Sequence, residues 1–226
     1  MTDSKLGPRE TPSCQLLQGK FVTLERLNPA KHGAGFERHL CGKANEPLWE
    51  FIPFGAPSDC THLFEILAKA EKRLGWIGFA LRDLSNNDAT GTVSLMRVRP
   101  EHGSAEIGCV VFGQALQRTP AATEAVFLLG KYLFEELGYR RYEWKCDNRN
   151  EASRRAAARF GFTFEGVFRN DMIVNGRSRD TAWFAMTDDD WKKLRPAYDA
   201  WLSDTNFDGR GQQKTSLKDL VSKALV

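Results

Sequence analysis

The segment GQALQRTPAATEAVFLLGKYLFEELGYRRYEWKCDNRNEASRRAAARFGF, residues 113–162, decides the fold. The segment follows a predicted strand at Ala105–Phe112. It reads as a loop at Gln117–Ala122 that enters a helix at Ala121–Leu137, then a strand at Tyr139–Cys146 and a second helix at Asn150–Phe160. A helix N-terminus that follows a strand offers unpaired backbone N–H groups at a positive dipole end, so it can hold a phosphate. This order of elements therefore predicts a nucleotide or coenzyme binder.

Shorter elements flank this segment on both sides. Runs of β-forming residues predict further strands at Lys20–Leu27, Trp76–Arg82, Thr90–Arg97, Phe162–Asn170 and Arg179–Met186. Cap and proline signals predict helices at Pro29–Cys41, from Asp59 and from Thr187, and Pro196 is expected to disturb the last of these. The alternation of short strands with helices predicts an α/β or α+β sheet domain.

Composition narrows the function classes for this chain of 226 residues. We expect a flexible lead-in over residues 1–15, one domain over 16–205 and a polar tail over 206–226. A net charge of +3 with interleaved signs argues against nucleic acid or a membrane surface as the main partner. Five scattered cysteines without C-x-x-C spacing argue against a disulfide framework or a metal site. A polar N-terminus without an apolar core is no signal peptide, which predicts a cytoplasmic protein.

Two motifs carry a resemblance to a known family. The chain has QRTPAATEA at Gln117–Ala125 and NEASRRAAARFGFTFEG at Asn150–Gly166. These resemble the loop R-G-x-G-Y-A-T-E-A and the later pattern N-x-x-S-x-x-x-x-x-x-G-F-x-x-E-G of GNAT acyl-CoA N-acyltransferases of the RimJ/RimL type. The second match is the more specific. The first departs from the family, because Arg118 and Pro120 stand where glycines are usual.

The resemblance implies a fold and a reaction. The fold would be a mixed, twisted sheet of about six to seven strands with helices on both faces, splayed between Ala105–Phe112 and Arg140–Cys146 to admit acyl-CoA. The reaction would be direct transfer of an acetyl group from acetyl-CoA to a primary amine, with no metal. The residues implied in coenzyme binding are Val111, Phe112, Gln117, Arg118, Thr119, Ala121, Ala122, Asn150 and Ser153.

Each coenzyme motif also has a purely structural interpretation. The loop before Ala121 could simply start a helix with Pro120 at its first position, which offers one N–H fewer to a phosphate. Arg118 could compensate with a charge-assisted contact. Asn150 could cap the next helix, which asparagine does readily, and both roles can hold at once.

The predicted catalytic groups are a base and an acid. Attack by a lysine-type amine, whose pKa is about 10.4, requires removal of a proton, for which Glu106 is the first candidate and Asp171 the second. Many members of the family carry a tyrosine acid at the position of Ala157. RimL-like enzymes have a serine three residues after the asparagine, which Ser153 matches, although a serine in a first helical turn is otherwise ordinary.

The acceptor is left open by the sequence. The aromatic stretch Leu48–Pro57 suggests that Trp49, Phe51 and Phe54 contact the substrate, and a packed connector is the alternative. The acceptor could be a protein N-terminus, an aminoacyl-nucleotide, a polyamine or another amine. The oligomeric state also stays open, a homodimer being one option. A rival function is a catalytically impaired CoA-binding interaction module.

Overall fold

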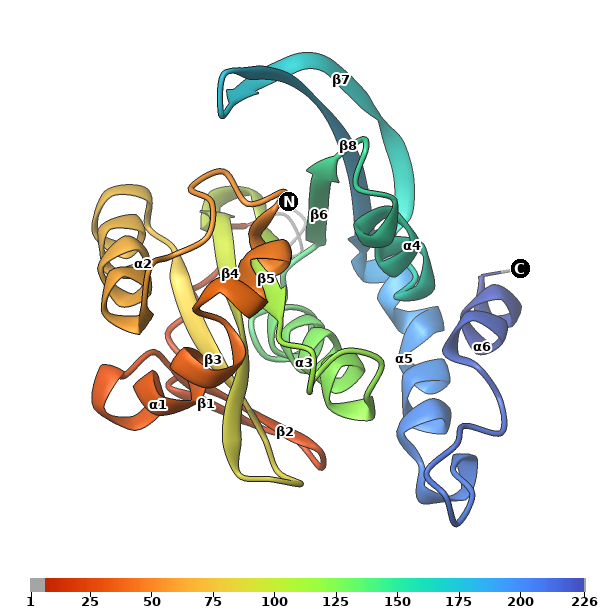
Figure 1. The fold of residues 1–226 in the computed structure, drawn as a ribbon. Coiled ribbons are helices and arrows are strands. Elements are labelled where there is room, and N and C mark those ends of the chain that lie inside the picture. Colours follow the sequence, from red (N-terminus) through yellow and green to blue (C-terminus); the bar gives the residue numbers. More distant parts are fainter. Residues whose placement is uncertain (1–6, 226) are drawn as a thin grey trace.

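One mixed sheet of eight strands organises the computed structural model, which describes residues 7–225 (Figure 1). The strands follow the order β1-β2-β3-β4-β5-β6-β8-β7, and every neighbouring pair is antiparallel except β5 and β6. Their bounds are β1 Leu16–Gln18, β2 Val22–Arg26, β3 Ile77–Asp83, β4 Asp88–Arg99, β5 Ser104–Phe112, β6 Arg141–Asp147, β7 Thr163–Val174 and β8 Arg177–Thr187. The mixed sheet agrees with the expectation, and the short strand β1 brings the count to eight.

Helices lie on both faces of this sheet, as expected. They are α1 Pro29–His39, α2 Cys60–Leu74, α3 Pro120–Lys131, α4 Glu151–Arg159, α5 Asp188–Leu202 and α6 Leu217–Ala224, with shorter helical turns η2 Lys43–Trp49, η3 Pro100–His102, η4 Tyr132–Glu136 and η5 Asp204–Asn206. The parallel pair β5–β6 needs a crossover, which α3 and η4 provide. The expected single helix over 121–137 is thus an α-helix that continues as one π-helical turn.

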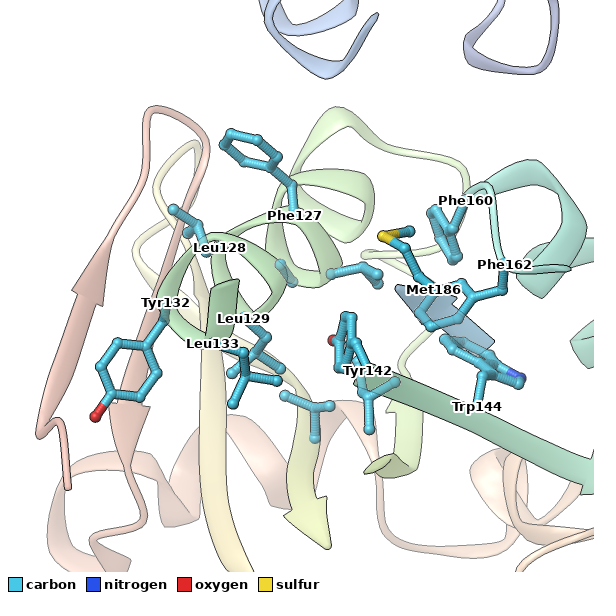
Figure 2. Packing of buried hydrophobic residues seen from close by; sticks show 14 of the residues in the cluster. Phe127, Leu128, Leu129, Tyr132, Leu133, Tyr142, Trp144, Phe160, Phe162 and Met186 are labelled. Atoms are coloured by element: carbon cyan, nitrogen blue, oxygen red, sulfur yellow. The ribbon is translucent and has the colours of Figure 1, made fainter. Parts of the chain in front are cut away.

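Two hydrophobic clusters hold the layers together. The larger one packs α3, α4 and α5 against the sheet, and Figure 2 shows the rings of Tyr142, Trp144, Phe160 and Phe162 within it. The smaller one packs α1, α2 and η2 against the opposite face. Along β6 the side chains alternate between the larger cluster and a charged face, which is the period of two expected of a strand.

Capping groups explain where the helices start. The Asn28 side chain accepts the Lys31 N–H ahead of α1, and Thr187 forms a capping box with Asp190 ahead of α5. The expected break of the last helix at Pro196 does not occur. Pro196 is exposed and α5 runs through it, so the carbonyl that loses its N–H partner lies on a solvated side of the helix.

The two ends of the described chain are packed more closely than expected. The Tyr132 hydroxyl accepts the N–H groups of Ser13 and Cys14 at 2.9 and 3.2 Å, which holds this part of the predicted lead-in in place. Residues 1–6 of the lead-in lie outside the described residues. In the C-terminal segment, α6 lies beside α5 and buries Leu217 and Val221 (Figure 1). Both segments therefore pack against the rest of the described chain. Within residues 7–225 we find no helix that is both long and apolar enough to cross a membrane.

Candidate active site

The strands β5 and β6 are paired along only half of their length. Ser104–Ile107 lie opposite Arg141–Trp144, and the pairing stops there. Beyond that point β5 continues beside β4, and Lys145–Asp147 of β6 continue beside β8. The pairing of the two strands therefore ends at the place where the sequence motifs predicted a splay, and we call this unpaired part of the sheet the β5–β6 cleft.

A bulge interrupts the pairing of β5 with β4 next to this cleft. Thr92 of β4 pairs with Val111 and Ser94 pairs with Gly108, so Cys109 and Val110 have no ladder partner in either neighbouring strand. Cys109 has a φ of +47°, which is an uncommon conformation for a residue with a side chain. The unpaired stretch offers backbone groups to a molecule lying between the strands. The predicted arm-binding residues follow directly, with Val111 buried and Phe112 half-buried.

The loop before α3 has the shape of an anion-binding turn. Arg118 takes a φ of +61°, in the left-handed region that favours glycine, at a position where the family pattern has glycine. Thr119 caps the helix by accepting the Ala122 N–H at 3.2 Å, and Pro120 is the first helical residue. The start of α3 is therefore that of a normally capped helix. The feature that matches the glycine of the family pattern is the left-handed backbone of Arg118.

Only some of the predicted phosphate-binding amides are available. The Gln117 N–H donates to Gly113 at 3.1 Å, and the Thr119 N–H donates to Leu116 at 3.3 Å. No hydrogen bond from the N–H group of Arg118 or Ala121 is found in the described part of the chain. Of the amides predicted to bind phosphate, these two are therefore available.

Asn150 and Ser153 lie together at the start of α4. The Asn150 side-chain oxygen accepts the Ser153 N–H at 3.0 Å, so the capping role is present. The Trp144 indole donates to the Ser153 hydroxyl at 3.0 Å and fixes its position beside β6. Ala157 is fully buried in α4. Of the predicted acid positions, the serine is thus the one with a hydroxyl.

Glu106 lies on the opposite face of the sheet from α3, at the point where the strands begin to separate. Its side chain is 2% exposed, and its Oε2 lies 3.1 Å from Lys145 Nζ and 3.6 Å from Arg97 Nε. Burial raises the pKa of this carboxyl, and the positive charges of Lys145 and Arg97 only partly offset that effect. A raised pKa suits a group that must take up a proton near neutral pH.

A second buried carboxylate, Glu143, pairs with Glu106 across the strands. Arg99 Nη2 and Arg141 Nε each lie 2.8 Å from Glu143 Oε1, and Arg141 also holds Glu165 of β7 through two bonds of 2.7 and 2.5 Å. Sequence reasoning did not assign these groups to the site. The alternation of Arg141, Glu143 and Lys145 along β6 was the available signal, and it indicated only a face less buried than the other.

The predicted substrate contacts Trp49, Phe51 and Phe54 differ in their exposure. Trp49 is 1% exposed and its indole donates to the Leu40 carbonyl at 2.7 Å, which agrees with the alternative of a packed connector. Phe51 and Phe54 are half-buried and remain predicted contacts.

Asp171 lies in an exposed bulge of β7, beyond the part of the hairpin that faces β6, and no described contact joins it to Glu106.

Thiol chemistry is disfavoured at the cleft. Burial raises the pKa of Cys109 to about 12, so this thiol stays protonated and is a poor nucleophile. All five cysteines are free thiols. Among residues 7–225 there is no group of three or more His, Cys, Asp and Glu side chains placed to hold a metal ion.

Comparison with known proteins identifies the family of this protein. The family model for the acetyltransferase (GNAT) domain matches residues 23–163. The chain belongs to the GNAT acetyltransferase family.

Individual relatives agree with this assignment. The crystal structure of a GCN5-related N-acetyltransferase from Brucella melitensis is 43% identical, with a TM-score of 0.90 over 96% of this chain and 98% of that one. The Bacillus subtilis protein named uncharacterized N-acetyltransferase YoaA is 31% identical over 52% of this chain, a match that spans 64% of YoaA. YdaF of the same organism, provisionally named a ribosomal N-acetyltransferase, is 27% identical over 60% of this chain and 90% of its own length.

Proposed function

We propose that this protein is an N-acetyltransferase of the RimJ/RimL type, which transfers an acetyl group from acetyl-CoA to a primary amine by direct attack in a ternary complex. The amine would belong to a protein N-terminus or to a small molecule. The observation that carries the proposal is the position of Glu106, a buried carboxyl with a raised pKa at the point where β5 and β6 separate. The family assignment and the name of YdaF support the reaction class and the subtype respectively.

The residues of the cleft fit acetyl-CoA. The bulged edge of β5 and the free N–H groups of Arg118 and Ala121 can hold an extended arm and a pyrophosphate. Arg118 can add its charge, and the Asn150 amide nitrogen can donate to the arm while its oxygen keeps the cap. Acetyl-CoA would supply the activated acyl group and a thiolate leaving group.

The chain would supply proton transfer and polarisation. Glu106 would accept a proton from the ammonium form of the acceptor, which leaves a neutral amine to attack. The unpaired backbone at Cys109 and Val110 would donate to the carbonyl oxygen as negative charge develops there. Ser153 would relay to the leaving sulfur the proton that the attacking nitrogen loses after it adds to the carbonyl, so the serine hydroxyl regains a proton as it gives one up. Trp144 holds this hydroxyl without using its proton.

Release of free CoA tests the proposal. The purified chain is incubated with acetyl-CoA and a panel of peptides with free N-termini, amino acids and polyamines. The proposal expects CoA release that depends on one acceptor class and forms an equal amount of acetylated amine. Tight acetyl-CoA binding without turnover on any acceptor would favour the impaired binding module instead.

A further inference from the structure

A row of three side chains on β8 lies on the same sheet face as Glu106. Trp183 pairs with Lys145 of β6, and Lys145 Nζ lies 5.2 Å from the Trp183 ring centre and 3.1 Å from Glu106 Oε2. Side chains alternate along a strand, so Arg179 and Thr181 lie on that face as well. We call Arg179, Thr181 and Trp183 the Arg179 row.

The polar groups of this row are buried and lack partners. Arg179 is 6% exposed and Thr181 is 0% exposed. Arg179 Nε, Thr181 Oγ1 and Trp183 Nε1 have no hydrogen-bond partner, and within residues 7–225 no ion pair reaches Arg179. Buried polar groups are almost always hydrogen-bonded and buried charges paired, so three such groups in a row call for a ligand.

The nearby carboxylate of Asp147 does not satisfy Arg179. Both oxygens of Asp147 are engaged by Arg149, with Oδ1 accepting Nε at 3.0 Å and Oδ2 accepting Nη2 at 2.7 Å. The Arg149 backbone N–H also donates to Oδ1 at 2.9 Å. Asp147 therefore feels the charge of Arg179 without bonding to it.

The chemistry of the row matches an anion. A guanidinium, an indole N–H and a hydroxyl are all able to donate, and a carboxylate accepts several such bonds at once. The same face also carries Arg97, whose guanidinium lies 5.1 Å from the Trp183 ring centre, next to Lys145. A polycationic acceptor would meet repulsion here.

We propose that the Arg179 row binds a carboxylate of the acceptor, so that the acceptor is an amine that also carries an acidic group. This inference rests on the proposed function, because it places the carboxylate on the molecule whose amine reaches Glu106. The row would fix the distance between the two groups of the acceptor and would select against polyamines.

Binding of matched probes tests the site without requiring turnover. The probes are ω-amino carboxylates with one to five methylenes, each compared with its primary amide, titrated into the full chain by calorimetry. We expect at least one acid to bind 10-fold or more tighter than its amide, in line with hydrogen bonds to a charged group. Equal affinity of acid and amide at every length would overturn the proposal.

Variants assign the preference to the row. Arg179→Met should reduce the preference for the acid to within about twofold, whereas Arg177→Met, which removes an exposed arginine from the same strand, should leave it unchanged. An equal loss of the preference for the acid in both variants would show a general effect of charge and would overturn the assignment of the site to Arg179. Thermal melting checks folding. If Arg179→Met does not fold, Thr181→Val carries the test, and an unchanged preference in that variant overturns the assignment.

The outcomes separate this site from the proposed reaction. Binding of an acid through Arg179 without acetyl transfer to it would refute the reaction and keep the anion site. Acetyl transfer to amines with no preference for the acid would keep the reaction and refute the anion site.

Discussion

Glu106 and Glu143 lie directly opposite each other on β5 and β6, and Arg97 Nε lies 3.6 Å from an oxygen of each. Two carboxylates this close to the start of the cleft would repel if both were ionised without neighbours. Arg97, Arg99, Arg141 and Lys145 supply the compensating charge. The pKa of Glu106 therefore depends on the charges of these neighbours, and substitution of one of them should shift it.

Replacing the proposed base, Glu106, should abolish most of the activity. We expect Glu106→Gln to lower kcat/KM by about 10²- to 10⁴-fold, because proton transfer by a positioned group contributes on this scale. The affinity for acetyl-CoA should stay within about twofold, since Glu106 is proposed to contact the acceptor amine and not the coenzyme. Steady-state kinetics and calorimetry measure the two quantities. Activity close to that of the wild type would remove Glu106 from its role.

The pH profile should report Glu106. The base acts in its ionised form, so kcat/KM should rise with pH through the raised pKa of Glu106, above the ordinary 4.5. Burial and the charge of Glu143 raise that pKa, so Glu143→Gln should move the acid limb to lower pH. An acid limb that stays in place, in a variant that melts like the wild type, would show that the limb belongs to another group.

Acid should destabilise the protein through Glu25 on β2. Burial raises the pKa of Glu25, but hydrogen bonds from Lys31 and His32 and the charge of Arg82 outweigh it and bring the pKa to about 2. The pKa is lower in the folded state, so this stabilisation is present above pH 4.5 and is lost as the pH falls toward 2.

The expected loss from Glu25 is on the order of 3 kcal/mol in the free energy of unfolding. Urea denaturation between pH 6 and pH 2.5 measures it. Glu25→Gln, the control, should be less stable at pH 6 and should show a flatter dependence on pH. The same slope in both proteins would contradict this role.

Arg118 combines backbone strain with a predicted phosphate contact. Its φ of +61° costs about 1 kcal/mol for a residue with a side chain. Arg118→Gly should relieve that strain and leave the stability equal or higher by up to about 1 kcal/mol, part of the gain being offset by the flexible unfolded chain. The same change should weaken acetyl-CoA binding about 10-fold through the lost charge-assisted contact.

Arg118→Ala is the matched control for this loop. It loses the charge and keeps the strained conformation, so it should bind acetyl-CoA as weakly as Arg118→Gly but be less stable. Chemical denaturation and calorimetry give both values. Wild-type affinity in the glycine variant would show that Arg118 makes no contact with the coenzyme.

The sequence was most informative where local chemistry alone sets the structure. The cap of Asn28 and the box of Thr187 mark helix starts, and the two motifs that resemble the GNAT family locate the cleft. It was less informative where distant segments meet. The buried pair of Glu106 and Glu143 depends on the parallel register of β5 and β6, which no local pattern specifies.

Burial was the property that the sequence indicated least. The aromatic stretch around Trp49 allowed either a substrate contact or a packed connector, and Trp49, at the end of η2, is buried in the cluster formed with α1 and α2. The tail after residue 205 looked polar, but Leu217 and Val221 at helical spacing are enough to pack α6 on α5. Arg179 gave no signal, because a single arginine in a predicted strand is indistinguishable from a solvated one until its surroundings are known.

Asn150 allows the most direct test of the coenzyme site. Its oxygen caps α4, and its amide nitrogen is proposed to donate to acetyl-CoA. Asn150→Ser keeps a good cap and replaces the two amide N–H donors by one hydroxyl on a shorter side chain, whereas Asn150→Ala removes both the cap and the donors. A variant that loses affinity without losing stability therefore separates the two roles.

Calorimetric titration of acetyl-CoA into the wild type and Asn150→Ser tests the central claim that the β5–β6 cleft binds acetyl-CoA. We predict one site per chain in the wild type, with about 10-fold weaker binding in Asn150→Ser at an unchanged melting temperature. No heat of binding in the wild type, or equal affinity in the two proteins, would contradict the assignment of this cleft.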